Sequence, residues 1–236
     1  MDIKFLDHHL KQLKESIQHQ GLTWVGSAPV GWATYVASKL DLGQCDLTKF
    51  SAKPINRSAL YEICSSIHYS DLEVAMHIMA WGGMRRDHGV MVLATFETWS
   101  PIVAQLRSGA LNRSDAYQLF MIIRAQGLLK GMGPAFFTKI IFFSSPDHSG
   151  YIMDQWTGRS INLLLGRELV DLNKTVTGQS VSDKNSNETY DRFCKSIEAL
   201  TDQVDGVEDP KIMEEFIFSS GGRKKGLWRA YTIDNS

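Results

Sequence analysis

The sequence predicts a mainly α-helical protein. Apolar residues recur at steps of three and four along much of the chain, the spacing that gathers them on one face of an α-helix. Strand signals are sparse, and no internal repeat or convincing interdomain linker interrupts the pattern. A chain of 236 residues with 43% apolar side chains has ample material for a core. We therefore expect a single, mostly helical domain over residues 1–236.

Three helices are expected in the first part of the chain, over residues 3–19, 58–67 and 71–81. The apolar stripe of the first helix is formed by Ile3, Leu6, Leu10, Leu13 and Ile17. Ser58 and Asp71 are the expected N-caps of the other two, because short polar side chains accept hydrogen bonds from a first helical turn. Residues 89–98 are apolar and fit either a helix or a strand.

Four further helices are expected, over residues 115–129, 134–144, 150–165 and 188–200. Ser114 is the expected cap of the first, and Pro134 opens the second because proline suits the first helical position. Asp147 or Ser149 would cap the third. Residues 172–187 are polar and rich in turn-forming residues, so a loop beside the core is expected there.

Composition excludes several classes of protein. No apolar run approaches the roughly 20 residues of a transmembrane helix, and the N-terminus is charged where a signal peptide is apolar. Three scattered cysteines argue against a disulfide framework, a zinc ribbon or an iron–sulfur cluster. We expect a cytoplasmic, monomeric protein with no membrane partner, no organic cofactor and no metal ion held by side chains.

The charges are balanced overall but unevenly distributed. The chain has 25 Lys and Arg residues against 26 Asp and Glu, a net charge of −1. Residues 105–167 hold seven basic and three acidic residues, whereas residues 168–209 hold ten acidic and four basic ones. This pattern fits a protein with one face that meets an anion, and it equally fits ordinary scatter of charge.

The segment from Leu128 to Leu165 carries the most chemical information. It begins as an apolar helix end, turns through Gly131, Met132 and Gly133, and continues into the helix that Pro134 opens. The glycines leave backbone N–H groups uncovered, and the second helix adds the positive end of its dipole. Such a turn can hold a phosphate, although by itself it also fits a simple helix corner.

This segment resembles the helix-hairpin-helix motif of the DNA glycosylase superfamily, whose hairpin reads roughly Leu-x-Gly-x-Gly-x-x-x-Ala. Leu129, Gly131 and Gly133 match the leucine and the glycines. In that superfamily a catalytic aspartate follows about twenty residues later, where this chain has Asp154 within YIMDQW. The wider pattern over residues 128–167 most resembles the 8-oxoguanine DNA glycosylase fold. The resemblance implies a helix-hairpin-helix DNA glycosylase-like helical fold and an enzyme that flips out a base and cleaves its N-glycosidic bond.

One departure from the family pattern concerns the nucleophile. Bifunctional members carry a lysine two positions after the second glycine, and this chain has Ala135 there. Monofunctional relatives also lack that lysine and use water. Lys139 lies one helical turn further on, on the face of Ala135, so its amine can reach the same pocket and form a Schiff base. Alternatively, Lys139 extends along an apolar helix or meets a DNA phosphate.

Asp154 suits the chemistry of base excision. Cleavage of the N-glycosidic bond builds positive charge on the deoxyribose, and a nearby carboxylate stabilises it or activates the attacking group. A plain helix N-cap is the alternative interpretation of this residue. The residues expected to contact DNA are Lys130, Gly131, Gly133, Gln155, Trp156 and Arg159. The resemblance also allows a monovalent cation held by the backbone carbonyls of the hairpin.

Two substrate classes fit an enzyme of this kind: an oxidised purine in DNA repair, or a modified base of phage DNA in antiviral defence. Aromatic side chains would read the flipped base; the candidates are Trp24, Trp32, Trp81, Phe136 and Trp156. A rival hypothesis is a non-catalytic helix-hairpin-helix DNA-binding module, which the alanine at position 135 favours and the aspartate at position 154 disfavours. A third is a helical protein that binds no nucleic acid.

Overall fold

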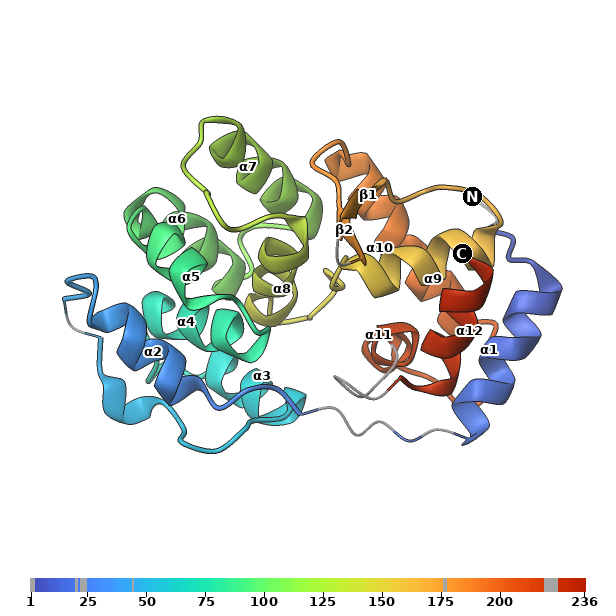
Figure 1. Cartoon of the computed structure of the whole chain (residues 1–236), viewed down its shortest axis with the longest axis horizontal. Helices are drawn as coiled ribbons and strands as arrows, with labels where there is room; N and C mark the ends of the chain where they lie inside the picture. Colours follow the sequence, from blue (N-terminus) through green and yellow to red (C-terminus); the bar gives the residue numbers. More distant parts are fainter. Residues whose placement is uncertain (1–2, 20, 22–24, 44, 176–177, 219–224) are drawn as a thin grey trace. The chain divides into compact units, whose positions relative to one another are not determined.

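The computed structural model describes residues 3–19, 21, 25–43, 45–175, 178–218 and 225–236. The described residues are mainly helical, with one small sheet, which confirms the fold class expected from the sequence (Figure 1). Contacts divide the chain into two compact units. The middle unit is Val25–Gly150, and the terminal unit combines Met1–Trp24 with Tyr151–Ser236. That the whole chain acts as one domain stays a prediction.

The middle unit is built around helix α4. Its elements are α2 (Pro29–Ala37), a 3₁₀ turn (Leu47–Lys49), α3 (Arg57–Ser65), α4 (Asp71–Trp81), α5 (Arg86–Leu93), α6 (Phe96–Arg107), α7 (Arg113–Ala125) and α8 (Pro134–Ser144). Every residue of α4 from Glu73 to Trp81 is buried, because α2, α3, α6 and α8 all pack against this helix. Helix α8 is also buried along most of its length, which fixes the segment that follows the glycine turn.

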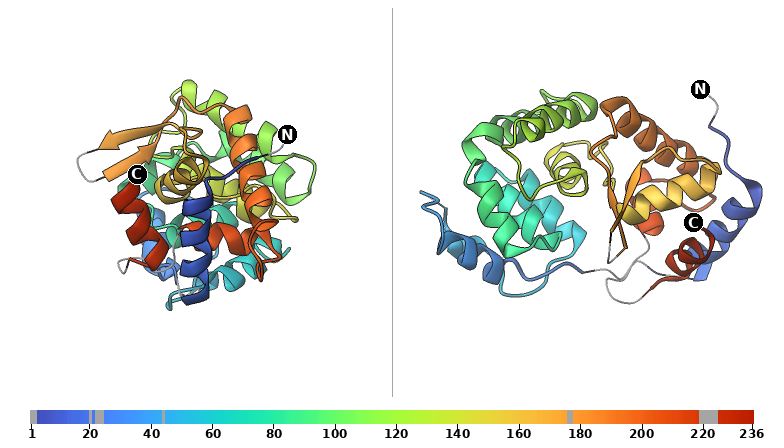
Figure 2. Two further views of the ribbon diagram at one scale, coloured as in Figure 1. Left: turned by 90° about the vertical axis from the view of Figure 1, so that its right-hand side faces the viewer. Right: turned by 45° about the horizontal axis from the view of Figure 1, so that its top comes forward.

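The terminal unit is built around helix α9. Its elements are α1 (Asp7–His19), α9 (Gln155–Leu165), strands β1 (Leu172–Thr175) and β2 (Gly178–Val181), α10 (Asn187–Thr201), α11 (Pro210–Phe218) and α12 (Leu227–Asn235). Helix α9 packs against α1, α10, α11, α12 and β2. The first and last helices lie side by side (Figure 2), and a 2.8 Å hydrogen bond joins His9 to Tyr231.

Several expected helices have their expected bounds, but most of their caps differ. Residues 71–81 and 134–144 are helical as expected. The expected caps Ser58, Asp71 and Ser114 are wrong, because Asn56, Ser70 and Asn112 accept the first-turn hydrogen bonds instead. In each case the true cap lies one or two residues earlier. The apolar segment 89–98 spans two helices, α5 and α6, which meet at Ala94 and Thr95.

Three sequence expectations need larger corrections. The first helix begins at Asp7 rather than at residue 3, because the N–H of Leu6 bonds to the carbonyl of Leu164. The helix expected from residue 150 begins at Gln155, because Asp154 is its N-cap in extended conformation and residues 151–153 are buried before it without regular secondary structure. The loop expected at 172–187 contains an antiparallel hairpin with Leu172 opposite Val181 (Figure 2).

Candidate active site

The glycine turn joins α7 to α8 through a tight hairpin. Gly127 and Gly131 both have positive φ angles, +77° and +91°, which favour glycine. Leu129 lies between the two glycines and Met132 follows the second. Their side chains are buried, at 1% and 0% exposure, and anchor the turn to the core. The N–H of Met132 closes the turn on the carbonyl of Leu129 at 3.1 Å.

Gly131 is also required by the close approach of a neighbouring helix. A Cβ atom at this position would lie 3.0 Å from the Cβ and 3.2 Å from the Cα of His88 in α5. Any other residue would therefore have to push the hairpin away from α5 as well as adopt a strained φ angle. Lys130, which the sequence places among the DNA contacts, is exposed beside this turn.

The N-terminus of α8 offers backbone donors for an anion. Gly133 is its N-cap and supplies no side-chain hydrogen bond, and Pro134 follows at the first helical position. The first-turn N–H groups of a helix lack intrahelical partners and carry the positive end of its dipole. This geometry suits the phosphate seat that the sequence predicts at Gly131 and Gly133.

The carbonyls of the hairpin already accept hydrogen bonds from a cationic side chain. Arg124, in the last turn of α7, donates from Nη1 to the carbonyl of Leu129 at 3.2 Å and to that of Met132 at 2.8 Å. A monovalent cation at these oxygens would have to displace the guanidinium or lie against a like charge. These two carbonyls therefore already have a positively charged partner within the chain.

Lys139 is held inside the middle unit, close to the position of the absent family lysine. Its Nζ donates to the carbonyl of Ala135 at 2.6 Å, and the residue is only 7% exposed. The ammonium lies 5.0 Å from the centroid of the Phe136 ring. The aliphatic stem packs on the backbone of Gly82, where a Cβ would lie 2.9 Å from Lys139 Cδ.

Asp154 is the N-cap of α9, in place of the expected Asp147 or Ser149, and its catalytic role stays a prediction. Its Oδ1 accepts hydrogen bonds from the N–H groups of Trp156 at 2.7 Å and Thr157 at 3.1 Å, and its own N–H donates to the hydroxyl of Thr157 at 2.9 Å. Among the described residues, none donates a hydrogen bond to Oδ2. The cap therefore fixes the carboxylate through Oδ1.

Sequence reasoning missed a buried arginine in the same unit, whose pKa is influenced by the charge of this carboxylate. Arg229 of α12 is 6% exposed, and its Nη2 donates to the carbonyl of Phe218 at 2.8 Å. Burial lowers the pKa of Arg229, and the charge of Asp154 acts in the opposite direction. The side chain stays protonated at all ordinary pH values. The only sequence signal was its place in the basic, aromatic tail around Trp228.

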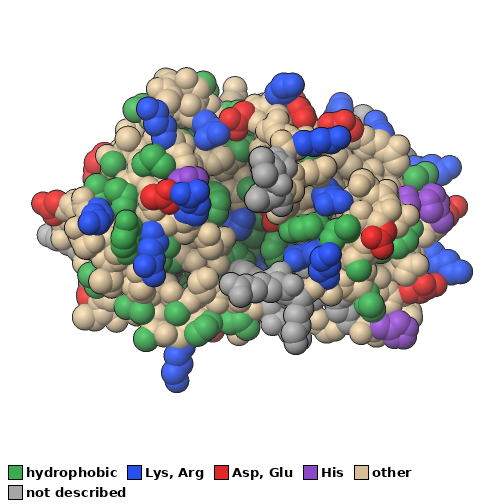
Figure 3. Space-filling view, viewed as in Figure 1, with side chains coloured by type: hydrophobic (Ala, Val, Ile, Leu, Met, Phe, Trp, Pro, Cys, Tyr) green, Lys and Arg blue, Asp and Glu red, His purple; other side chains and the backbone are tan. Residues whose placement is uncertain are grey.

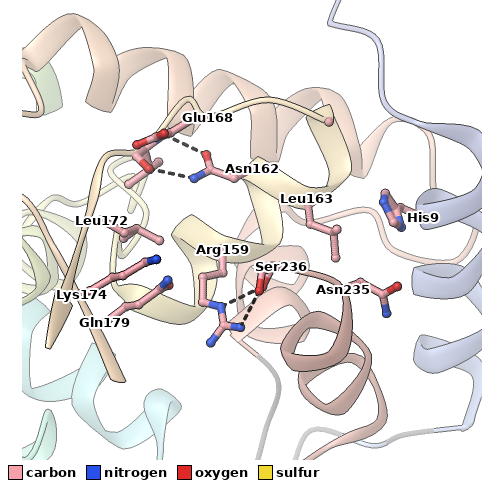
Figure 4. A pocket seen from close by; sticks show the side chains of 12 residues that line it. His9, Arg159, Asn162, Leu163, Glu168, Leu172, Lys174, Gln179, Asn235 and Ser236 are labelled. Atoms are coloured by element: carbon pink, nitrogen blue, oxygen red, sulfur yellow. Dashed lines mark hydrogen bonds between the residues drawn. The ribbon is translucent and has the colours of Figure 1, made fainter. Parts of the chain in front are cut away.

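The remaining DNA-contact candidates of α9 have contacts within the terminal unit. The guanidinium groups of Arg159 and Arg229 lie over the ring of Trp156, at 5.2 and 4.7 Å from its centroid. Arg159 also donates to the hydroxyl of Ser236 at 2.9 Å, at the edge of a pocket of about 500 Å³ (Figure 4). The Oε1 atom of Gln155 accepts from the backbone of β2 at Gln179, 3.3 Å away.

The aromatic candidates for base recognition divide clearly. Trp32 and Trp81 are core residues, at 6% and 2% exposure, and Trp32 donates to the carbonyl of Met84 at 2.8 Å. Trp24 lies outside the described residues. Phe136 and Trp156 are partly exposed, and each is in contact with a charged site candidate, so these two remain candidates for contact with a base.

The structure thus groups the candidate site residues in two sets. Lys130, the two hairpin glycines and Lys139 belong to the middle unit, and Asp154, Gln155, Trp156 and Arg159 belong to the terminal unit. On the face shown in Figure 3, Lys and Arg side chains occur on both units and alternate with Asp and Glu. In the described ranges, no helix is long and apolar enough to cross a membrane, and no group of three His, Cys, Asp or Glu side chains could hold a metal ion.

Comparison with known proteins gives one match. A family model described as "Putative 8-oxoguanine DNA glycosylase OGG-like protein" matches residues 15–218. No curated protein and no solved structure matches the chain. The match covers the hairpin, Lys139, Asp154 and most of both units, and it confirms the resemblance found in the sequence. Membership implies DNA as the partner. The chain belongs to this family of OGG-like proteins.

Proposed function

We propose that this protein is a DNA glycosylase that flips out a damaged or modified base and excises it with Lys139 as the nucleophile. The observation that carries the choice of nucleophile is the position of the Lys139 amine. Its Nζ lies 2.6 Å from the carbonyl of Ala135, the residue that stands where bifunctional family members carry their lysine. A longer reach from the next helical turn thus replaces the missing side chain.

The surroundings of Lys139 fix the position of its amine. The residue is 7% exposed, and its stem is pressed against Gly82. The Nζ atom is held by the carbonyl of Ala135, one helical turn earlier. An amine held in one position is oriented for attack on a sugar carbon before the substrate binds.

The reaction assigns separate tasks to the amine and the carboxylate. The nitrogen of Lys139 attacks C1′ of the flipped nucleotide, and the electron pair of the N-glycosidic bond leaves with the base, which takes up a proton. Loss of a proton from the lysine nitrogen and opening of the sugar ring then give a Schiff base, from which the 3′-phosphate can be eliminated. Asp154, through its Oδ2, would stabilise the positive charge on the sugar, a contribution of about two to three decades of rate.

Borohydride trapping tests the nucleophile directly. Duplexes labelled at one end and carrying 8-oxoguanine, uracil, alkylated purines or hypermodified phage cytosines would be incubated with the protein, and each reaction split between alkali and borohydride. We expect a trapped covalent adduct that disappears in Lys139→Gln. The matched control is Lys53→Gln, which removes an exposed lysine of the middle unit outside the candidate site and should keep the adduct.

Other outcomes of this experiment would identify a different nucleophile, substrate class or function. Cleavage that needs alkali and leaves no adduct would make water the nucleophile and Lys139 structural. Release of 8-oxoguanine would indicate repair, whereas release of the phage-type bases alone would indicate antiviral defence. Salt-dependent DNA binding without release of any base would favour the non-catalytic binding module.

A further inference from the structure

We propose that the Arg124 guanidinium takes the place of the monovalent cation at the hairpin, so that DNA binding by this hairpin needs neither K⁺ nor Na⁺. The two carbonyls that converge on this side chain belong to Leu129 and Met132, on either side of the turn. Both accept from the same nitrogen, Nη1, at 3.2 and 2.8 Å. Convergence of backbone oxygens on one positive charge is the arrangement that a bound cation would otherwise require.

Local structure explains why the arginine reaches these oxygens. Arg124 is the last residue but one of α7, and the chain reverses at Gly127, whose φ angle is +77°. The reversal brings the loop back over the last helical turn, and the buried side chains of Leu129 and Met132 fix the direction of their carbonyls. A cationic side chain is also favoured at the C-terminus of a helix, where the dipole is negative.

The same guanidinium lies next to the start of α8. A Cβ atom on Gly133, the N-cap of α8, would be 3.9 Å from Nη2 and 4.0 Å from Cζ of Arg124. A phosphate at this N-terminus would therefore meet uncovered backbone donors and a fixed positive charge together. Because this charge is covalently attached, it does not dissociate when the solution contains no small cation.

The inference rests on the proposed function only in that the hairpin binds DNA; it does not depend on base release. The test replaces KCl by tetramethylammonium chloride at the same ionic strength, which keeps general salt screening constant. Binding of the full-length chain to a fluorescent duplex with a tetrahydrofuran abasic analogue would be measured in both salts. We expect dissociation constants that agree within about twofold.

Arg124→Gln removes the charge and leaves the carbonyls in place. We expect this variant to bind DNA at least about tenfold more weakly in tetramethylammonium, with part of the loss restored by K⁺, as two charged hydrogen bonds are lost. The matched control is Arg113→Gln, on the same helix, whose guanidinium bonds to the carbonyl of Ser149 outside the hairpin. The control should lose affinity equally in both salts, if at all.

A tenfold or larger loss of affinity by the native chain in tetramethylammonium would overturn the proposal. So would an Arg124→Gln variant that binds as tightly as the native chain in both salts. If the variant does not fold, the native chain alone decides. If no DNA is bound in any salt, the proposed function fails, and the inference is tested by melting temperatures in the two salts. K⁺ should then raise the melting temperature of Arg124→Gln and leave that of the native chain unchanged.

Discussion

Two substitutions of Asp154 should separate its role in the fold from its role in the reaction. The structure gives one carboxylate oxygen, Oδ1, to the backbone N–H groups of Trp156 and Thr157 and leaves Oδ2 without a hydrogen bond from the described residues. Asp154→Asn keeps an oxygen for the cap, because asparagine caps helices about as well as aspartate. Asp154→Ala removes the cap and the carboxylate together. The two variants therefore differ in stability but share a missing negative charge.

The expected magnitudes follow from helix capping. Replacing an N-cap aspartate by alanine costs about 0.5–2 kcal/mol, which for a chain of this size lowers the melting temperature by about 2–6 °C. The asparagine variant loses only the favourable term between the carboxylate and the helix dipole, about 0.3–1 kcal/mol. In the reaction, loss of the carboxylate should slow base release by about 10²- to 10³-fold in both variants.

Thermal melting followed by circular dichroism and single-turnover base release would be measured on the same preparations. We expect Asp154→Asn to melt within about 3 °C of the native protein, to bind DNA normally and to release almost no base. Native rates of base release by Asp154→Asn would refute the catalytic role and leave Asp154 as a cap alone. Equal destabilisation by asparagine and alanine would instead show that the charge, rather than the cap, holds the start of α9.

Three further predictions concern the middle unit. Gly131→Ala should destabilise the protein by about 2–3 kcal/mol in urea unfolding, because the new Cβ is both strained by the positive φ angle and too close to His88. Gly127→Ala has the same strain but no atom within 4 Å of the new Cβ, so it should cost only about 1–2 kcal/mol. Equal costs would contradict the close approach. Burial raises the pKa of Glu73, but hydrogen bonds from Lys49, Ser70 and Asp46 outweigh it and leave the pKa below its ordinary value of 4.5. The ionised carboxylate therefore stabilises the fold above pH 4.5, and this stabilisation is lost as the pH falls through the lowered pKa. Glu73→Gln should therefore cost about 2–3 kcal/mol at pH 7 and progressively less below pH 4.5, and a pH-independent cost would exclude the ionised form as the cause. Burial first, then the neighbouring carboxylates, raise the pKa of the Cys45 thiol to about 11, so iodoacetamide should alkylate it at least about tenfold more slowly at pH 8 than free cysteine, with the rate rising up to pH 11.

Helices were the predictable part of this fold, and their caps were not. Residues 71–81 and 134–144 were predictable because each is a mostly apolar run with a clear boundary signal: Gly82 and Gly83 follow the first, and Pro134 opens the second. A cap depends on a single hydrogen bond, and two candidate residues often stand within one turn of each other. Asn56 and Ser58 are such a pair: the asparagine caps because its side chain reaches the N–H of Ala59 at 2.9 Å.

The β-hairpin escaped prediction because its cause is not local. Residues 172–181 are mostly polar and show no buried face of their own. Strands form there because β1 pairs with β2 and because the Gln155 side chain of α9 accepts a hydrogen bond from the backbone of β2. Before β1, the backbone N–H and carbonyl of Asp171 both form hydrogen bonds with the side chain of Asn185, which follows β2. The sequence pattern of residues 172–181 does not indicate these hydrogen-bond partners, which lie elsewhere in the chain.

The candidate site shows the same division between local and distant causes. The hairpin and the aspartate were found because each depends on short-range spacing that a resemblance can match. Arg124 and Arg229 were missed, because their contacts form only after folding. Arg124 contacts two loop carbonyls, and Arg229 contacts the carbonyl of Phe218 and the ring of Trp156. In the sequence, both counted only as positive charge.

Helix ends explain how both charged groups acquire fixed positions. The carboxylate of Asp154 is held because α9 begins there and its first N–H groups need an acceptor. The guanidinium of Arg124 is held because α7 ends there and the returning loop presents carbonyls that need donors. Each group satisfies backbone atoms that would otherwise lack partners, so its side chain is ordered before any DNA arrives. An N-cap and a catalytic carboxylate are therefore compatible roles for one residue, since the cap supplies the preorganisation that catalysis requires.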